Sequence, residues 1–213
     1  MGSVFGVVSE ETPSYTLLYK DPDNSFEIRS YAARVAVSCR SPTRASTSSS
    51  VGTENDASER GRFFMKLASY IGVMGAPQNV ENAPIAMTAP VVTRHGRSEM
   101  QFILPEDKSA PTSPAPAPAP ALAAQGVHVI DRPAKVFAVR TFSGGWGRDA
   151  FEQERDSLLA SLKQEQKNGT RNFSFTIAEP LYYEEYRYNP PWTMAPLRTN
   201  EVAVEVRWNE HEG

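Results

Sequence analysis

The stretch FEIRSYAARVAV, residues 26–37, decides the fold because it is echoed later in the chain as VHVIDRPAKVFA, residues 127–138. Apolar residues coincide at the first and third positions of the two stretches. An Ala-basic-Val triplet then follows at 33–35 and again at 134–136. Both stretches are typical of a β-strand. The echo therefore indicates an internal repeat, and the sequence that follows each copy can be compared.

A helical pattern follows each copy. Residues 59–74 and 148–168 repeat apolar side chains at three- and four-residue spacing, which predicts two amphipathic helices. Asn168-Gly169 is a stop signal for the second helix. The residues expected on the inner faces are Phe63, Phe64, Leu67, Ala68, Ile71 and Met74 in the first helix, and Phe151, Arg155, Leu158, Leu159 and Leu162 in the second.

Two strand candidates follow each helix. They are residues 85–94 and 100–105 in the first half and residues 173–187 and 201–208 in the second. The alternation of EVAVEVRW at 201–208 predicts a half-exposed antiparallel strand, with Val202, Val204 and Val206 on one face. The chain thus reads as β-α-β-β twice. This predicts an α+β fold: a single domain over residues 1–213, with a core of about 14–208, in which an antiparallel sheet or distorted barrel is flanked by two helices.

Two segments interrupt this pattern and are interpreted as loop insertions. Residues 41–58 are rich in serine and threonine, and residues 109–120 alternate proline with alanine. Such segments bury too little apolar surface to offset the cost of ordering, so we expect both to be solvated. The PxxP at Pro111–Pro114 could dock weakly on a protein partner, although a plain loop extension explains it as well.

The bulk composition argues against several classes of partner. A net charge of −3 and a pI near 5.7 give no general attraction for nucleic acid or anionic lipid. The single cysteine, Cys39, fits a reducing compartment, and no apolar run is long enough for a transmembrane helix. The N-terminal residues lack the pattern of a secretory signal. We therefore expect a cytoplasmic monomer, with import into an organelle left open.

Catalytic motifs are weak. No histidine (His95, His128 or His211) stands at metal-ligand spacing from another histidine or from cysteine, and His128 is expected to point outward. Glu184 and Glu185 are adjacent in a strand and should face opposite sides of it. FSGGWGRD, residues 142–149, lacks the lysine of a phosphate loop and is better explained as a tight strand-to-helix turn. No enzyme class emerges from these patterns.

A binding constellation is more evident. Methionines, aromatic residues and basic residues gather in or near the first helix, the segment IAMTAPV at 85–91 and the loop YNPPWTMAPLRTN at 188–200. Methionine adapts its shape to flat rings, and arginine can bind carboxylates bidentately. This combination favours a groove for a large, flat, anionic ligand, whereas Phe63, Leu67 and Ile71 are better explained as core residues. The members are Met65, Met74, Met87, Met194, Phe63, Phe64, Tyr188, Trp192, Arg60, Arg62, Lys66, Arg94 and Arg198.

These motifs resemble the SOUL haem-binding protein family in order and spacing. The resemblance rests on RFFMKLASYIGVMG (62–75), IAMTAPV (85–91), MQFILP (100–105), RPAKVFAVRTFSG (132–144) and YNPPWTMAPLRTNEVAVEV (188–206). It extends over residues 5–208, apart from the two insertions. It implies two β-α-β-β repeats and non-covalent binding of haem or related porphyrins in a shallow apolar groove beside the first helix, for intracellular buffering or transport.

The resemblance also implies which side chains bind the ligand. Basic residues near the first helix and in the late loop would contact the propionates, and one helix face would contact the ring. The chain departs from relatives that carry lysine near Ser69 and at Thr193 or Met194. Combined with the constellation above, the predicted contacts are Arg60, Arg62, Phe64, Lys66, Leu67, Ala68, Ile71, Met87, Trp192, Met194 and Arg198.

No residue is singled out as the iron ligand. His95, Met87 and Cys39 are weak candidates by residue type. Two alternatives to a carrier remain at this point: an enzyme that degrades tetrapyrroles or removes their metal, and a protein-interaction module that binds no ligand.

Overall fold

The computed structural model describes residues 8–23, 25–40, 53–94, 99–109, 114–145, 147–167, 172–181 and 183–210. The chain divides into two compact units that interleave along the sequence. Unit 1 comprises Met1–Val8, Ser14–Ala32 and Ala134–Gly213, and unit 2 comprises Ser9–Pro13 and Ala33–Pro133. Both units combine antiparallel strands with helix, so the predicted α+β class is confirmed. Whether the units act as one domain stays a prediction.

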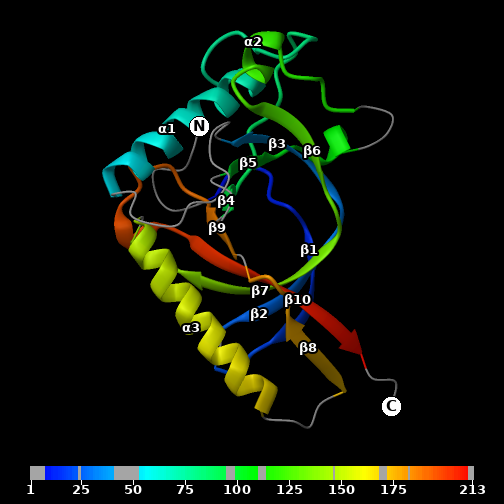
Figure 1. Cartoon of the computed structure of the whole chain (residues 1–213), viewed down its shortest axis with the longest axis vertical. Helices are drawn as coiled ribbons and strands as arrows, with labels where there is room; N and C mark the ends of the chain where they lie inside the picture. Colours follow the sequence, from blue (N-terminus) through cyan, green and yellow to red (C-terminus); the bar gives the residue numbers. More distant parts are fainter. Residues whose placement is uncertain are drawn as a thin grey trace. The chain divides into compact units, whose positions relative to one another are not determined.

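Unit 1 is built on a five-strand antiparallel path in the order β1-β2-β7-β10-β9, and β8 pairs with the C-terminal half of β10 (Figure 1). Its elements are β1 (Tyr15–Lys20), β2 (Glu27–Tyr31), β7 (Lys135–Phe142), α3 (Arg148–Lys167), β8 (Phe173–Ile177), β9 (Tyr183–Arg187), the short 3-10 helix η2 (Ala195–Leu197) and β10 (Asn200–Glu210).

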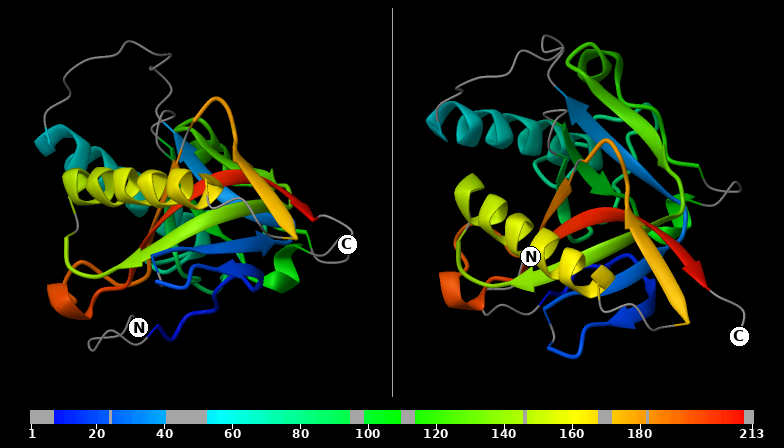
Figure 2. Two further views of the ribbon diagram at one scale, coloured as in Figure 1. Left: turned by 90° about the horizontal axis from the view of Figure 1, so that it is seen from below. Right: turned by 60° about the horizontal axis from the view of Figure 1, so that its bottom comes forward.

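The core of unit 1 lies between its sheet and α3, which runs along β7 and β10 (Figure 2). Leu158 and Leu162 of α3 are fully buried in this core, as expected from their spacing. They belong to one cluster with residues from β2, β7 and β10, including Ile28, Ala138 and Val202. The strand side chains of the cluster alternate with side chains on the opposite face of the sheet. That opposite face carries the polar network described below.

Unit 2 repeats this plan with four strands in the order β4-β5-β3-β6 and with α1 beside them. Its elements are β3 (Arg34–Arg40), α1 (Thr53–Ile71), β4 (Val91–Arg94), β5 (Glu99–Ile103), the 3-10 helix η1 (Glu106–Ser109), α2 (Pro120–Ala123) and β6 (Val127–Arg132). The core of the unit joins α1 to β3 and β5 through residues such as Leu67, Val37 and Phe102.

Each echoed stretch forms two strands, and the chain passes from one unit to the other between them. Residues 26–37 contribute to β2 in unit 1 and β3 in unit 2, while residues 127–138 contribute to β6 in unit 2 and β7 in unit 1. β2 pairs with β7, and β3 pairs with β6, both antiparallel. Each unit therefore contains at least one strand from the other half of the sequence, namely β1 and β2 in unit 1 and β6 in unit 2.

The first helix differs from its predicted bounds. It begins at Thr53, so residues 53–58 belong to α1 and not to a loop insertion; residues 41–52 lie outside the described residues. It ends at Ile71, and Gly72 follows with a φ of 88°, a left-handed value that suits glycine. Met74 therefore lies beyond the helix and is 55% exposed, which corrects its placement on the inner face.

Two of the predicted strands need correction, and each of these stretches contains a cis proline. Residues 85–90 are not in a strand: Thr88 makes an isolated bridge with Glu11, and β4 starts only at Val91, after the cis Ala89-Pro90 bond. The stretch 173–187 is two strands, β8 and β9, separated by the cis Glu179-Pro180 bond. β1 was not predicted.

Two segments expected to be exposed are at least partly buried. The first five residues of β10 are buried on both faces, which corrects the half-exposed strand. In the described part of the Pro-Ala segment, residues 114–120, Pro114, Ala117 and Pro120 are exposed, but Pro116 is buried, and its carbonyl accepts a 2.7 Å hydrogen bond from the Tyr70 hydroxyl. Pro111 of the PxxP lies outside the described residues. Among the described helices, none combines the length and hydropathy of a membrane span.

Candidate functional site

The predicted contacts on α1 divide into a buried and an accessible side. Leu67 and Ala68 have no exposed surface and Ile71 is 2% exposed, so their side chains contact the core of unit 2. Phe64 is partly buried against the same core. The centroids of its ring and that of Phe102 lie 5.4 Å apart in an edge-on arrangement. A ligand on the surface would touch Phe64 before it reached the other three.

The accessible side of α1 and of the turn after it includes three large apolar side chains. Met65 is 46% exposed, Val73 54% and Met74 55%. Arg62 is also exposed on α1. No exposed aspartate or glutamate occurs between Ala57 and Gly75. The corresponding side of α3 is polar: its exposed residues are Arg148, Asp149, Gln153, Asp156, Ala160, Lys163, Gln164, Gln166 and Lys167.

Segment 85–90 begins next to the C-terminal end of α1. The Ile85 amide donates a 3.0 Å hydrogen bond to the carbonyl of Ile71, the last residue of the helix. Met87 is half-buried and packs against the same core cluster as Phe64. Unit 2 therefore brings together Phe64, Met87 and the buried side chains of α1.

Two of the predicted cations hold backbone carbonyls. The Lys66 ammonium donates to the carbonyl of Gln125 at 3.1 Å. In unit 1, Arg198 donates from Nε to the Thr193 carbonyl and from Nη2 to the Pro191 carbonyl, both at 2.8 Å. These bonds give Arg198 a role in shaping the loop 188–200 whether or not it also contacts a ligand. Arg60 is partly exposed on α1.

Trp192 and Met194 extend from that loop into solvent. They are 71% and 61% exposed. The loop belongs to unit 1, whereas the α1 contacts belong to unit 2. Contact of Trp192 and Met194 with a ligand therefore stays a prediction.

The weak candidates for an iron ligand gain little from the structure. Cys39 has no exposed surface, and burial raises the pKa of its thiol, which disfavours the thiolate that binds iron. Met87 packs against the core, and His95 lies outside the described residues. Within the described part of the chain, no three His, Cys, Asp or Glu side chains lie close enough to hold a metal ion.

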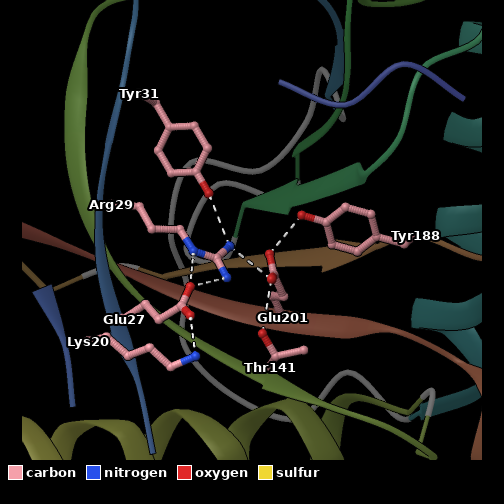
Figure 3. A network of polar contacts seen from close by, with 7 residues as sticks. All are labelled: Lys20, Glu27, Arg29, Tyr31, Thr141, Tyr188 and Glu201. Carbon is pink, nitrogen blue, oxygen red and sulfur yellow. Dashed lines mark hydrogen bonds and ion pairs between the residues drawn. The ribbon is translucent and has the colours of Figure 1, made fainter. Parts of the chain in front are cut away.

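The sequence did not predict a buried ionic network on the sheet of unit 1, on the face opposite α3 (Figure 3). Arg29 donates to Glu201 at 2.9 Å and to Glu27 at 2.8 Å. Glu201 also accepts hydrogen bonds from the hydroxyls of Tyr188 at 2.7 Å and Thr141 at 3.0 Å. The network therefore joins β2, β7, β10 and the start of the loop 188–200.

Burial and charge together shift the protonation equilibria of this network. Burial raises the pKa of the Tyr31 hydroxyl above its usual range, and the charge of Glu201 raises it further. The same two causes raise the pKa of Tyr188. Burial alone would lower the pKa of Arg29, but the charge of Glu201 and the interactions with Tyr31 together outweigh it, so the pKa of Arg29 is raised. Arg29 is thus charged, and both tyrosines are neutral, at physiological pH.

A second buried glutamate occupies the corresponding position in unit 2. The echo aligns Arg40 with Thr141, and these two residues are the cross-strand partners of Glu99 and Glu201. Glu99 is 6% exposed and accepts hydrogen bonds from Ser38 at 2.6 Å and Gln101 at 2.7 Å. Aligning the strands after the helices, as well as those before, would have indicated this pair of acids from the sequence.

Solved structures with similar folds are distant. A bacterial protein from Staphylococcus aureus described as a candidate transcription regulation protein is 12% identical, with a TM-score of 0.44, and the match covers 85% of this chain and 97% of that one. SAV2435 bound to tetraphenylphosphonium is 11% identical, with a TM-score of 0.48 and coverage of 85% and 93%. A hydrolase from Listeria innocua is 7% identical, with a TM-score of 0.44 and coverage of 84% and 92%. At these scores the similarities say nothing about function.

Among curated proteins, none matches the sequence significantly. The family model described as SOUL heme-binding protein, in contrast, matches residues 10–205. That range includes both halves of the echo, both long helices and nearly all of the strands. The chain therefore belongs to the SOUL haem-binding protein family.

Proposed function

We propose that the chain binds haem or a related porphyrin non-covalently on the accessible side of α1, for buffering or transport of the pigment. The observation that carries the proposal is the contrast between the two long helices. Met65, Val73 and Met74 are exposed on and just after α1 without an exposed acid among them, whereas the described exposed side of α3 has no large apolar residue. Exposed apolar side chains that gather on one surface commonly mark a ligand or partner site.

The chemistry of this surface fits a porphyrin. Methionine side chains adapt to a flat ring, and Phe64 is a partly buried aromatic residue of the same helix. Arg62 and Lys66 are the nearest basic residues in the sequence, and their charges complement the propionates. In this proposal the affinity arises from burial of the macrocycle, without a bond from the protein to the iron. Met87, which packs against the same core of unit 2, would extend the site.

A haemin titration followed by absorbance tests the proposal. The double variant M65S/M74S removes two exposed apolar side chains, and we expect its affinity for haemin to fall by about tenfold or more. The matched control is L181S, because Leu181 is an exposed apolar residue of unit 1, at 43% exposure. The proposal fails if M65S/M74S binds haemin as the wild type does, or if L181S loses as much affinity.

A further inference from the structure

The loop 188–200, between β9 and β10, carries large apolar side chains that are exposed to solvent. Trp192 is the most exposed of the large apolar residues that the structure describes, at 71%. Met194 is 61% exposed and Leu197 39%. Exposing such side chains to water is unfavourable. Three of them within six residues form a contiguous apolar tip.

The loop is braced from within, so that the tip is held outward. Arg198 clamps the carbonyls of Thr193 and Pro191, and the Thr193 side chain is 1% exposed. At the base of the loop, the Thr199 amide donates to the Asn189 side chain at 2.7 Å. An exposed Trp192 is therefore a fixed feature of the loop.

The backbone polar groups of the loop are largely used within unit 1. The amides of Thr193, Leu197 and Arg198 donate to carbonyls of the same loop, and the Ala195 carbonyl also accepts from Gly144. Residues 190, 191 and 196 are prolines, which have no amide hydrogen to satisfy. A segment that enters lipid must satisfy its backbone internally, because the bilayer offers no hydrogen-bond partners. The backbone groups named above meet that condition.

The charges of the loop are also compatible with entry into lipid. The sequence from Tyr188 to Asn200 contains no aspartate or glutamate, and its single cation, Arg198, is directed at the loop's own carbonyls. We propose that this tip, with Trp192, Met194 and Leu197, inserts into the interfacial layer of a lipid bilayer and so anchors the protein reversibly. Tryptophan and aliphatic side chains favour that layer. A protein partner would be expected to use outward polar groups as well, which the tip does not offer.

This mode of binding has a distinguishing property. Because the insertion is apolar, and the chain as a whole carries a net charge of −3, anionic lipid should not strengthen it. High salt should not weaken it either, since screening acts only on charges. Electrostatic binding by another surface would behave in the opposite way.

Flotation of the full chain, free of porphyrin, with phosphatidylcholine vesicles tests the proposal. We expect the wild type to bind these vesicles equally at low and high salt, and W192S/M194S to bind about tenfold more weakly. L197E, which places a charge at the tip, should have the same effect as the double variant. V80S is the matched control, because Val80 is 57% exposed in unit 2, and it should bind as the wild type does.

The proposal is overturned if the wild type does not float with the vesicles, or floats only when anionic lipid is present. It is also overturned if both tip variants bind normally, or if V80S loses as much binding as they do. Since no pigment is present, these outcomes are independent of those of the haemin titration.

Discussion

Arg29 of β2 and Glu201 of β10 lie 2.9 Å apart, with side chains only 7% and 6% exposed, although β7 lies between their strands in the sheet. The pair thus spans a strand that neither residue belongs to. Each charge has further partners, Glu27 for the arginine and two hydroxyls for the glutamate. Such partners are what make a buried ion pair tolerable, because they replace the water that each charge has lost.

Truncation of one member should therefore be costly. We expect E201A to lower the free energy of unfolding by about 3–5 kcal/mol, because Arg29 would keep an unpaired buried charge. The measurement is urea unfolding at neutral pH. The double variant R29M/E201L removes both charges and should be less destabilised than E201A. If the double variant loses as much unfolding free energy as E201A, or more, the pair must stabilise the fold by more than neutralising its own charges.

The stability of unit 1 should fall at high pH through its buried tyrosines. The pKa values of Tyr31 and Tyr188 are raised in the folded chain, whereas tyrosines of an unfolded chain ionise near pH 10. Their contribution is thus fully present below about pH 10 and is lost as the pH rises toward the folded-state values, by about 1.4 kcal/mol per pH unit for each tyrosine. Unfolding free energies measured above pH 10 should fall less steeply in Y31F/Y188F, and identical slopes would exclude this linkage.

Two glycines should respond to alanine with opposite signs. Gly126 has a φ of 88°, and a Cβ there would lie 2.6 Å from the Arg40 carbonyl oxygen, so G126A should destabilise the protein by more than about 1 kcal/mol. Gly61 lies within α1 with no atom within 4 Å of an added Cβ. G61A should stabilise the protein by up to about 1 kcal/mol, because alanine favours the helix. Thermal unfolding of both variants provides the check, and shifts of the same sign would contradict the backbone argument.

The basic residues of α1 should matter only for ligands with free carboxylates. R62A/K66A should bind protoporphyrin about three- to tenfold more weakly than the wild type, as expected for the loss of charge-assisted contacts. The dimethyl ester of the same porphyrin has no carboxylate, and its affinity should be equal for variant and wild type. A similar loss with the ester would assign these residues to the structure of the helix.

Iron should add little to the affinity. If no side chain bonds to the metal, protoporphyrin and haemin should bind with dissociation constants within about tenfold of each other, because both bury the same macrocycle. Parallel absorbance titrations measure this ratio. A preference for haemin of about a thousandfold, or about 4 kcal/mol, would instead require an iron ligand.

The α+β fold could be predicted from the sequence because the echo, the helical spacing and the valine alternation all agree. The buried positions of Leu67, Ala68, Leu158 and Leu162 followed from the same patterns. The prediction failed where a polar residue is buried by a distant partner. The alternation places Glu201 on the exposed side of a strand, whereas its burial depends on partners that include Arg29, 172 residues away.

The functions of loop residues were the second feature that the sequence could not fully predict. The sequence indicated that Arg198 and Trp192 lie in one functional loop, but it could not distinguish a guanidinium that meets a ligand from one that braces its own backbone. That distinction depends on where the Thr193 and Pro191 carbonyls point. Likewise, the alternation of proline and alanine predicts exposure, whereas Pro116 is buried and its carbonyl accepts a hydrogen bond from Tyr70.

The exchange of strands between the two halves bears on the origin of the chain. β6, from the second half, pairs with β3 of unit 2, and β2, from the first half, pairs with β7 of unit 1. An ancestor with a single copy of the motif would have lacked this partner strand, so two identical molecules would have had to lend it to each other. Fusion of the two genes would then have made a concentration-dependent assembly into an intramolecular one.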